Sequence, residues 1–386
     1  MKILYHHRVR SKDGQFVHIE EMCVALRQRG HEVILVGPRA FEADEFGADA
    51  GGVAVLKRFL PMILYELIEF AYAFVAYARL RKAYLEHRPD AVYERYQLYM
   101  PAGVWLKKRY GAPLLLEVNS PLADERFRVN GLALKWLADW TEKATWRGAS
   151  VVLPATAALS PYIRNAGVPD ERIHVVRNAI RPENFVDFPD REEAKRRLGV
   201  EDKLVLGFTG FVREWHNMER VVEFMAGRGR DIDAHFLMVG DGPSRANIEA
   251  IARRLGVRDR LTVTGVVPRS EVPSYVAAFD IAFNIDNVPY ALALKLFEYL
   301  AMGRAIIAPD SPNIREVLTD GKNAVLFDPE DPAAFDEALT MLCTDEKLRQ
   351  RISEGARNTI EEKGLTWAQN AQRVEELILS FVRPGG

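Results

Sequence analysis

A lysine and a glutamate one helical turn apart form the residue pair in this sequence best suited to hold a charged ligand. Lys295 and Glu298 lie in a segment, KLFEYLAMG, whose helix is expected to end at Gly303. The apolar run Ala305–Ala308 follows directly and predicts a buried strand. Both charges are therefore expected at the edge of a parallel sheet, where α/β proteins bind ligands. An ordinary surface pair is the alternative.

Two residues nearer the N-terminus, Gly14 and Asn119, could also contact a ligand. Gly14 lies between a predicted strand and a helix, where backbone N–H groups form an anion seat, although such a glycine is often only a turn residue. Asn119 follows the apolar run LLLEV and should lie at a strand tip, with Glu117 pointing to the same side. His18 lies one turn into the first helix. It is either a histidine with only a structural role, on the surface or in the core, or a residue of the site, and the sequence does not favour one interpretation over the other. No metal site is expected, because the D-x-D at Asp231 reads as a solvated loop.

Length and composition indicate an ordinary two-domain enzyme of 386 residues. A net charge of −2 does not suggest a nucleic-acid-binding protein. The two cysteines, Cys23 and Cys343, give no disulfide framework, which favours the cytoplasm. The first residues, MKILYHH, are not a signal peptide, because a polar loop follows them.

The segment Phe59–Ala78 is long and apolar enough to raise the question of membrane contact. Glu66 and Glu69 lie inside it and would be costly in a bilayer centre. Its apolar residues recur at helical spacing, with both glutamates off the stripe. We expect a helix that faces the core, with attachment to a membrane surface as the alternative. The formal net charge of the first lobe over 1–180 is +5, from 25 Lys and Arg against 20 Asp and Glu, which is too mild to indicate an anionic membrane.

Strands and helices alternate along the whole chain, which predicts parallel sheets in an α/β fold. The composition changes between Asn178 and Gly199, which marks a hinge. We predict an N-terminal Rossmann-like lobe over 1–180, completed by a C-terminal helix in 366–386, and a second lobe over 181–365. Strands are expected at Lys2–Tyr5, His31–Gly37, Asp90–Glu94, Leu114–Val118, Ser150–Pro154, Ile173–Arg177, Leu204–Thr209, His235–Val239, Leu261–Thr264, Ile281–Asn284, Ala305–Ala308 and Ala324–Phe327.

Several motifs in order resemble those of a known enzyme family. They are the glycine loop and helix ending in RGHEV, then VVRNAI, GFTGFVREWHN, MVGDGPSR, VTGVVPRSEVPSYVAAFDIAF and the long segment starting at KLFEYLAMG. Together they resemble the retaining GT-B glycosyltransferases of glycosyltransferase family 4, over essentially the whole chain. The resemblance implies two doubly wound lobes facing a cleft, with a sugar-nucleotide donor mostly on the second lobe and the acceptor on the first.

The resemblance also implies roles for individual residues. Lys295 and Arg213 would neutralise the diphosphate, Glu298 would accept hydrogen bonds from the ribose, and Asn119 would lie near the transferred sugar. Lys295, Arg213 and Asn119 are the candidate catalytic residues. No metal or cofactor is implied beyond a UDP- or GDP-sugar donor. The donor-binding residues implied are Gly14, Gly210, Arg213, His216, Gly240, Val266, Ala291, Leu292, Ala293, Lys295 and Glu298.

This sequence departs from the family pattern at several positions. Phe211 and His216 stand where the common form has arginine and lysine, which resembles the branch that carries W-H-G, although Asn217 replaces that glycine and VPYALAL replaces the usual glycine-rich run. Arg213 would then supply the missing cation, and His216 would donate to phosphate if the correct nitrogen carries its proton. Tyr290 replaces the first glutamate of the E-x7-E motif. A double displacement through that position is therefore excluded, and a same-face transfer fits better.

The sequence predicts a retaining, metal-independent hexosyltransferase. Its acceptor would be a saccharide, a lipid-linked molecule or a small molecule, and polysaccharide biosynthesis is a natural setting. The expected location is cytoplasmic, with the inner face of the membrane as an alternative. A nicotinamide-dependent oxidoreductase is weakly supported, because only one glycine follows the first strand. A non-catalytic sugar-nucleotide-binding protein of the same fold is the other alternative, because the first glutamate is missing.

Overall fold

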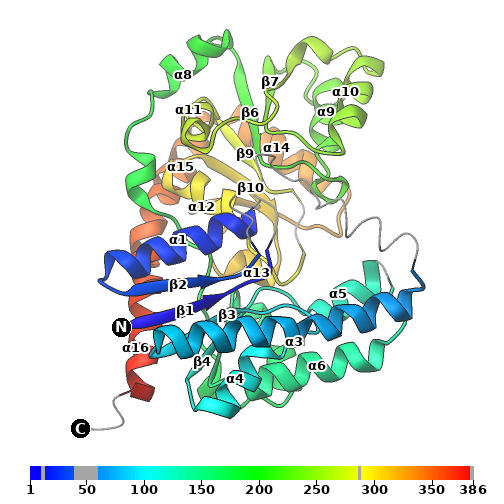
Figure 1. Cartoon of the computed structure of the whole chain (residues 1–386). Helices are drawn as coiled ribbons and strands as arrows, with labels where there is room; N and C mark the ends of the chain where they lie inside the picture. The colour runs from blue at the N-terminus through cyan, green and yellow to red at the C-terminus, as the bar shows by residue number, and fades with distance from the viewer. Residues whose placement is uncertain (10–13, 39–59, 130, 286–287, 383–386) are drawn as a thin grey trace. The chain divides into compact units, whose positions relative to one another are not determined.

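The computed structural model describes residues 1–9, 14–38, 60–129, 131–285 and 288–382, and the chain divides into two compact units. The first unit is Met1–Arg177 with Trp367–Gly386, and the second is Asn178–Thr366 (Figure 1). The boundaries predicted from sequence lie a few residues from these. Each unit is built on a parallel sheet with helices on its faces, so the prediction of two doubly wound α/β lobes is confirmed.

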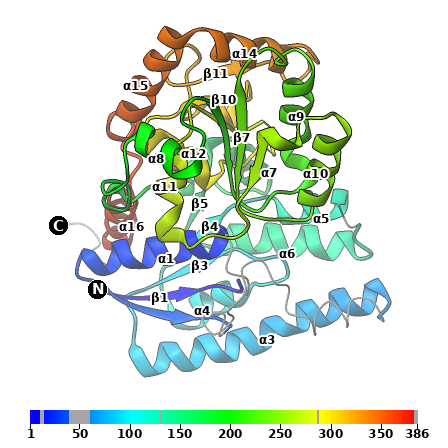
Figure 2. The same cartoon turned by 90° about the horizontal axis from the view of Figure 1, so that it is seen from above.

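The first unit has a five-stranded sheet in the order β2-β1-β3-β4-β5. Helix α1 packs on α16 on one side of this sheet, and α3 packs on α4 on the other side (Figure 2). The central strands are buried because both faces are covered. The strands are β1 (Lys2–His6), β2 (Glu32–Val36), β3 (Ala91–Arg95), β4 (Leu114–Val118) and β5 (Val151–Pro154), and the helices are α1 (Gly14–Gln28), α3 (Met62–His87), α4 (Ala102–Tyr110), α5 (Leu122–Val129), α6 (Lys135–Gly148), α7 (Ser160–Asn165) and α16 (Trp367–Val382).

The strand predicted at Ile173–Arg177 is wrong. Ile173 forms only an isolated bridge with Val152 of β5, and the rest of the segment is irregular. The N–H groups of His174 and Val176 do donate to β5, at 3.0 Å each. The segment therefore follows the edge of the sheet without continuing its ladder.

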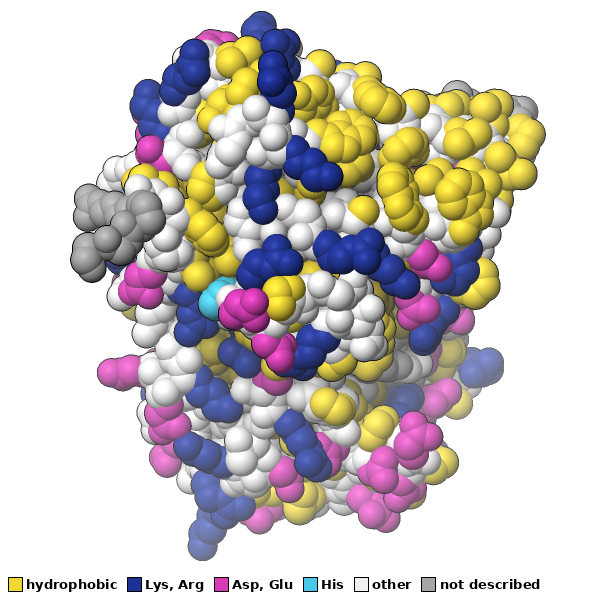
Figure 3. Space-filling view, turned by 90° about the horizontal axis from the view of Figure 1, so that it is seen from below, with side chains coloured by type: hydrophobic (Ala, Val, Ile, Leu, Met, Phe, Trp, Pro, Cys, Tyr) yellow, Lys and Arg dark blue, Asp and Glu magenta, His cyan; other side chains and the backbone are white. Residues whose placement is uncertain are grey.

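Helix α3 forms as predicted, but its orientation is the reverse of the prediction. The apolar stripe faces solvent, including Ile63, Leu67 and Phe74, whereas Tyr65 and Glu66 are buried. Figure 3 shows hydrophobic side chains gathered on this side of the first unit. The prediction of a core-facing stripe is therefore wrong. No helix in the described part of the chain is long and apolar enough to cross a membrane.

The buried carboxylate of Glu66 explains this orientation. It accepts hydrogen bonds from the N–H groups of Ala133 and Leu134, both at 2.8 Å, and from the Tyr99 hydroxyl at 3.2 Å. Ala133 and Leu134 immediately precede α6, so Glu66 satisfies backbone donors at the start of that helix. A buried carboxylate without such partners would cost several kcal/mol, roughly, so these bonds decide which side of α3 faces inward.

The second unit has a six-stranded parallel sheet in the order β11-β10-β9-β6-β7-β8. Every strand of this sheet pairs in parallel with its neighbours, and β6 pairs with β7 along its whole length. The strands are β6 (Leu204–Thr209), β7 (Ala234–Val239), β8 (Leu261–Val263), β9 (Ile281–Phe283), β10 (Ala305–Pro309) and β11 (Val325–Phe327), and the helices are α8 (Arg191–Leu198), α9 (Glu219–Ala226), α10 (Arg245–Arg254), α11 (Val272–Val276), α12 (Leu294–Ala301), α13 (Pro312–Arg315), α14 (Ala334–Thr344) and α15 (Glu346–Glu362).

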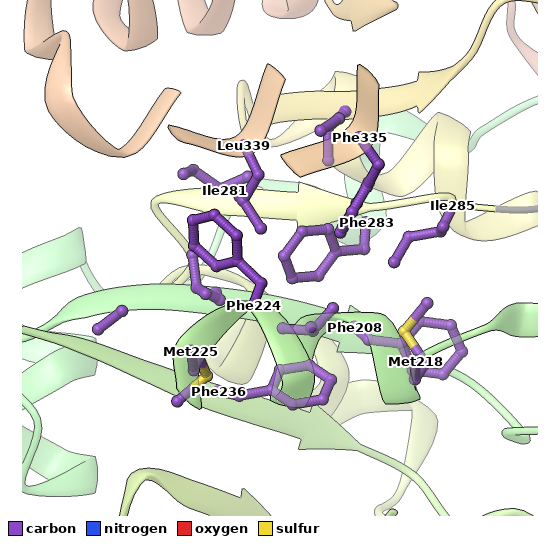
Figure 4. Packing of buried hydrophobic residues seen from close by; sticks show 14 of the residues in the cluster. Phe208, Met218, Phe224, Met225, Phe236, Ile281, Phe283, Ile285, Phe335 and Leu339 are labelled. Atoms are coloured by element: carbon purple, nitrogen blue, oxygen red, sulfur yellow. The ribbon is translucent and has the colours of Figure 1, made fainter. Parts of the chain in front are cut away.

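Aromatic side chains fill one face of this second sheet. Phe283 of β9 packs edge-on against Phe236 of β7, with ring centres 6.0 Å apart, and lies beside Phe335 of α14 (Figure 4). Large rings that interlock in this way fix the spacing of sheet and helices. The rigid sheet then positions the loops that leave the carboxyl ends of its strands.

Removal of the Glu66 carboxylate should destabilise the first unit. We expect Glu66→Ala to lower the free energy of unfolding by about 2–4 kcal/mol, because two backbone donors and a hydroxyl lose their acceptor. Chemical denaturation followed by tryptophan fluorescence measures the change. Glu86→Ala, an exposed position on the same helix, is the control and should change stability by about 0.5 kcal/mol or less. Equal effects of both substitutions would contradict the anchoring role of Glu66.

Candidate functional site

The order of strands in the second unit creates a switch point between β6 and β9. The chain moves from β6 toward β8 on one side and from β9 toward β11 on the other. Loops that leave neighbouring strands in opposite directions open a crevice at the carboxyl edge, where doubly wound proteins bind ligands. The loop after β6 carries Gly210 to His216, and the segment after β9 leads into α12. The topology thus brings together the segments that the sequence analysis selected.

The N-terminus of α12 has backbone donors that its own N-cap side chain does not cap. Its N-cap residue, Ala293, makes no side-chain cap hydrogen bond. The preceding carbonyl oxygens are already occupied: Asn313 donates to Ala291 at 2.6 Å, and Asn178 donates to Leu292 at 2.7 Å. The helix end therefore keeps its partial positive charge, while the loop that precedes it is held by amide side chains.

Lys295 places a cation at this helix terminus. Its Nζ lies 3.9 Å from the centre of the ring of Phe208, the penultimate residue of β6 before the loop. Burial lowers the pKa of Lys295 to about 7, and Glu298, one turn along the helix, opposes this change. A lysine with such a pKa gains its full charge when an anion binds beside it.

His216 is held as a neutral hydrogen-bond donor. Its Nδ1 accepts a hydrogen bond from the Arg213 N–H at 3.0 Å, so the neutral ring carries its proton on Nε2. Burial, and then the charge of Lys295, lowers the pKa of His216 to about 3. The ring also packs edge-on against Phe208, at 5.2 Å between ring centres. His216 and Lys295 therefore contact the same aromatic ring from the two segments.

Arg213 lies at the outer side of this loop. Its side chain is exposed, and its guanidinium lies about equally far from the rings of Phe211 and Trp215, at 5.2 and 5.0 Å. These cation–π contacts hold the Arg213 guanidinium on the exposed side of the loop. Trp215 is 55% exposed, so stacking on Arg213, and not core packing, is its contribution in this structure.

Two glycines bring the loops after β6 and β7 into close contact. A Cβ atom at Gly240, where φ is 132°, would lie 2.2 Å from the carbonyl oxygen of Gly210. At Gly210, by contrast, an added Cβ would meet open space, although its φ of 128° also suits glycine. Gly240 also forms a bridge with Gly265, next to the exposed Val266 on the loop after β8. The predicted residues Gly210, Gly240 and Val266 therefore occupy adjacent loops on the carboxyl edge.

Asn119 in the first unit is positioned by the buried carboxylate of Glu117. The Asn119 amide donates to Glu117 Oε1 at 2.6 Å, and the Tyr93 hydroxyl donates to Oε2 at 2.9 Å. Arg95 pairs with the same carboxylate, and His18 Nε2 lies 3.0 Å from it. Burial would raise the pKa of Glu117, but His18 and Arg95 lower it well below its usual range. His18 is thus a buried partner of a carboxylate, and not a surface residue.

Gly14 is the first residue of α1 and is exposed. Residues 10–13, which precede it, are outside the described part of the chain. Its role in donor binding stays a prediction, as does the role of Asn119.

Two further residues belong to the description of the second-unit site. Asn284 was not selected from the sequence, and Tyr290 stands where a glutamate was expected. Asn284, just past the end of β9, is 2% exposed, and its Nδ2 finds no acceptor among the described residues. No motif signals it; the strand order, which sequence alone does not give, is what places it at the switch point. Tyr290, in place of the expected glutamate, is mostly buried. Among the described residues, no group of three or more metal-ligating side chains is assembled.

Two family models match successive parts of the chain. The model described as "Glycosyl transferase 4-like domain" matches residues 13–179, and "Glycosyl transferases group 1" matches residues 190–359. The chain belongs to the group 1 glycosyltransferases with the GT-B fold. The prediction of this family is therefore confirmed.

Individual relatives agree with this assignment. The chain is 27% identical over 255 residues to an alpha-D-kanosaminyltransferase of Streptomyces kanamyceticus, covering 64% of this chain and 65% of that protein. It is 36% identical over 168 residues to the 2-deoxystreptamine glucosyltransferase of the same organism, covering 42% of this chain and 43% of that one. The matches thus span less than two thirds of these relatives.

Solved structures share the fold at low sequence identity. The structure of Anabaena Alr3699/HepE in complex with UDP superposes with a TM-score of 0.76 at 18% identity, covering 98% of this chain and 100% of that one. Sucrose-phosphate synthase from Thermosynechococcus elongatus gives a TM-score of 0.75 at 15% identity, covering 98% of both chains. At these identities the likeness establishes the fold.

The lowered pKa of Lys295 predicts a pH-dependent effect on stability. Between about 7 and the usual value of 10.5, the unfolded chain binds a proton that the folded chain lacks, so stability rises with pH. Below pH 7 the charge is present in both states and the folded state carries the full desolvation cost. We expect Lys295→Met to be more stable than the wild type by about 1–3 kcal/mol at pH 6, with the difference shrinking by pH 9.

Denaturant titrations at the two pH values measure this difference. Lys347→Met, at an exposed position on α15, is the matched control and should show no pH-dependent gain. A variant that is equally stable as the wild type at pH 6 would contradict the buried charge at Lys295.

Proposed function

We propose that this protein is a retaining glycosyltransferase that moves a hexose-type sugar from a UDP- or GDP-sugar to a hydroxyl acceptor, without a metal ion. The observation that carries the proposal is the convergence at the switch point of the second unit. The uncapped N-terminus of α12, the Lys295 ammonium and the Nε2–H of His216 all supply positive potential there. A diphosphate is the ligand class that such a set of donors fits.

The remaining donor contacts follow from the same elements. Glu298 lies one turn after Lys295 on α12, at the spacing that lets a carboxylate accept two ribose hydroxyls while the lysine holds the phosphates. The open space at Gly210 gives the donor room for close approach of the backbone. Arg213, held beside Trp215 on the same loop, adds a second cation near the diphosphate.

A same-face transfer accounts for the chemistry with these residues. As the bond between the anomeric carbon and the diphosphate oxygen breaks, negative charge develops on the leaving group. Lys295, His216 and the α12 terminus stabilise that charge. The acceptor oxygen forms the new glycosidic bond on the same face, and its proton passes to the departing phosphate oxygen. No side-chain nucleophile is required, which is consistent with tyrosine at position 290.

The relatives support a broad acceptor class. Their names include transferases that act on aminocyclitol, inositol phosphate, malate and lipopolysaccharide core acceptors. We propose a saccharide, lipid-linked or small hydroxylated acceptor, bound by the first unit near Asn119. The proposed setting is the cytoplasm.

A panel of sugar nucleotides tests this function directly. Purified protein is incubated with UDP- and GDP-hexoses, with and without a mixture of glycoside and cyclitol acceptors, and in the presence of EDTA. We expect nucleotide release with one donor class, no effect of EDTA, and an α-linked product from an α-linked donor by NMR. Binding of a donor without any release or transfer would support the non-catalytic alternative. Absence of binding to every UDP- and GDP-sugar would reject the proposal.

Substitutions on α12 should weaken the donor site. We expect Lys295→Ala and Glu298→Gln each to reduce donor affinity or kcat/KM by tenfold or more, because charge-assisted contacts contribute about 1.5–3 kcal/mol. Isothermal titration with the donor and steady-state kinetics measure both. Lys347→Ala on α15 is the control and should leave both quantities unchanged. Unchanged donor affinity and kinetics in both site variants would refute the assignment.

The pH dependence of donor binding should report the charge of Lys295. Its pKa of about 7 in the free protein means that binding takes up a proton above that pH, so donor affinity should be constant below pH 6 and fall as pH rises from 7 to 9. Lys295→Arg retains the charge and should abolish this dependence. His216, neutral throughout this range, should add no inflection. A wild-type affinity that is flat from pH 6 to 9 would contradict this account.

A further inference from the structure

The outward side of α3 carries an unusual concentration of exposed apolar side chains. We call this surface the α3 face; its first part consists of Ile63, Leu64, Leu67, Phe74 and Val75. These side chains are each between 44% and 59% exposed. They share one side of the helix at spacings of three, four and seven residues. The only acidic residues in this half of the helix, Glu66 and Glu69, point away from it and bind partners within the unit.

Exposed side chains of α5 and α6 extend the apolar surface of this part of the unit. Phe127 and Val129 of α5 and Trp136 and Trp140 of α6 are 47–73% exposed. Glu69 binds Arg126 of α5, and Glu66 binds the backbone just before α6, so the three helices are fixed to one another. Figure 3 shows hydrophobic side chains clustered over one end of this side of the first unit, with Lys and Arg side chains beside them.

The same side of α3 becomes basic in its second half. Arg79, Arg81 and Lys82 are exposed, and Lys82 continues the line of Leu64 and Val75 along the helix. Arg81 donates to the Tyr110 hydroxyl of α4 at 2.8 Å, which ties the two helices together. Helix α4 adds the exposed Lys108 and Arg109 and contains no acidic residue. Against these five cations, the exposed part of the two helices has one carboxylate, Glu86.

We propose that the α3 face and the adjoining basic side chains attach the first unit to the surface of an anionic lipid bilayer. Helix α3 would lie in the interface, with its apolar half inserted and its basic half on the headgroups. Exposed tryptophans such as Trp136 and Trp140 prefer this interfacial depth. The modest net charge of the whole lobe conceals a local excess of cations at α3 and α4.

The chemistry of the surface favours lipid over a protein partner. The apolar residues form one continuous helical stripe without buried polar anchors, and lysines border it. Protein interfaces are depleted in lysine, whereas lysine stems extend along membrane surfaces while their charges reach the headgroups. A helix of 26 residues that is held along its inner side by Glu66 lies on the membrane and does not cross it.

Vesicle co-sedimentation tests this proposal without any donor or acceptor, so it is independent of the proposed activity. Full-length protein is mixed with vesicles of phosphatidylcholine alone or with 30% phosphatidylglycerol at about 0.1 M salt, a condition at which the Debye length is about 10 Å. We expect binding to the anionic vesicles, at least tenfold weaker binding to the neutral ones, and a blue shift of tryptophan fluorescence on binding.

Substitutions in the apolar part and in the basic part of the surface separate the contribution of apolar insertion to membrane binding from the contribution of charge. Leu67→Glu/Phe74→Glu should reduce the partition coefficient for anionic vesicles at least tenfold. Lys82→Glu/Lys108→Glu should reduce it by roughly tenfold or more, since each basic residue near such a surface contributes about fivefold. The matched controls are Met341→Glu and Lys347→Glu in the second unit, which replace an exposed apolar and an exposed basic residue and should bind as the wild type does. Circular dichroism verifies that every variant is folded.

Three results would overturn the proposal. The first is no binding to anionic vesicles by folded wild-type protein. The second is binding that the α3-face variants leave unchanged. The third is a dimer, seen by light scattering, that Leu67→Glu/Phe74→Glu dissociates, which would assign the surface to a second copy of the chain.

Discussion

Positive potential at the start of α12 is the constraint on which the second unit depends. The Lys295 ammonium lies over the Phe208 ring, its pKa falls to about 7, and the side chain of the N-cap residue Ala293 does not cap the helix terminus. Each of these features disfavours the protein without a ligand and favours a bound diphosphate. His216 adds a hydrogen-bond donor without adding charge, because burial and the neighbouring Lys295 keep its ring neutral.

The rest of the second unit makes this arrangement rigid. The Tyr299 hydroxyl of α12 accepts a hydrogen bond from the Thr209 N–H at 2.9 Å, which ties the helix to the end of β6. Asn313 and Asn178 fix the loop before the helix through its carbonyl oxygens. Preorganised donors stabilise developing charge without reorganisation during the reaction, which is how a site without a metal ion can serve a diphosphate leaving group.

Much of the architecture could be predicted from local patterns, because strands and helices alternate and each kind has its own period. Strand β6 was predicted to the residue, and Lys295 and Glu298 were placed on one helix correctly. The direction in which α3 faces could not be predicted, because periodicity defines a stripe but not what lies beside it. The tautomer of His216 and the position of Asn284 also depend on contacts between distant segments.

Buried carboxylates explain why the prediction for α3 failed, and they also hold segments of the first unit together. Glu66 and Glu117 are buried, and each binds several donors from other segments of the unit. In a sequence, a glutamate inside an apolar run suggests a solvent-facing side, since an isolated buried charge is costly. Once partners exist the argument reverses: the carboxylate becomes the inward anchor, and the apolar residues on the opposite side of the helix must face outward. An amphipathic helix whose charged side is buried therefore has an exposed apolar side for a geometric reason, and such a side is stable in water only at a cost that contact with an apolar medium would remove.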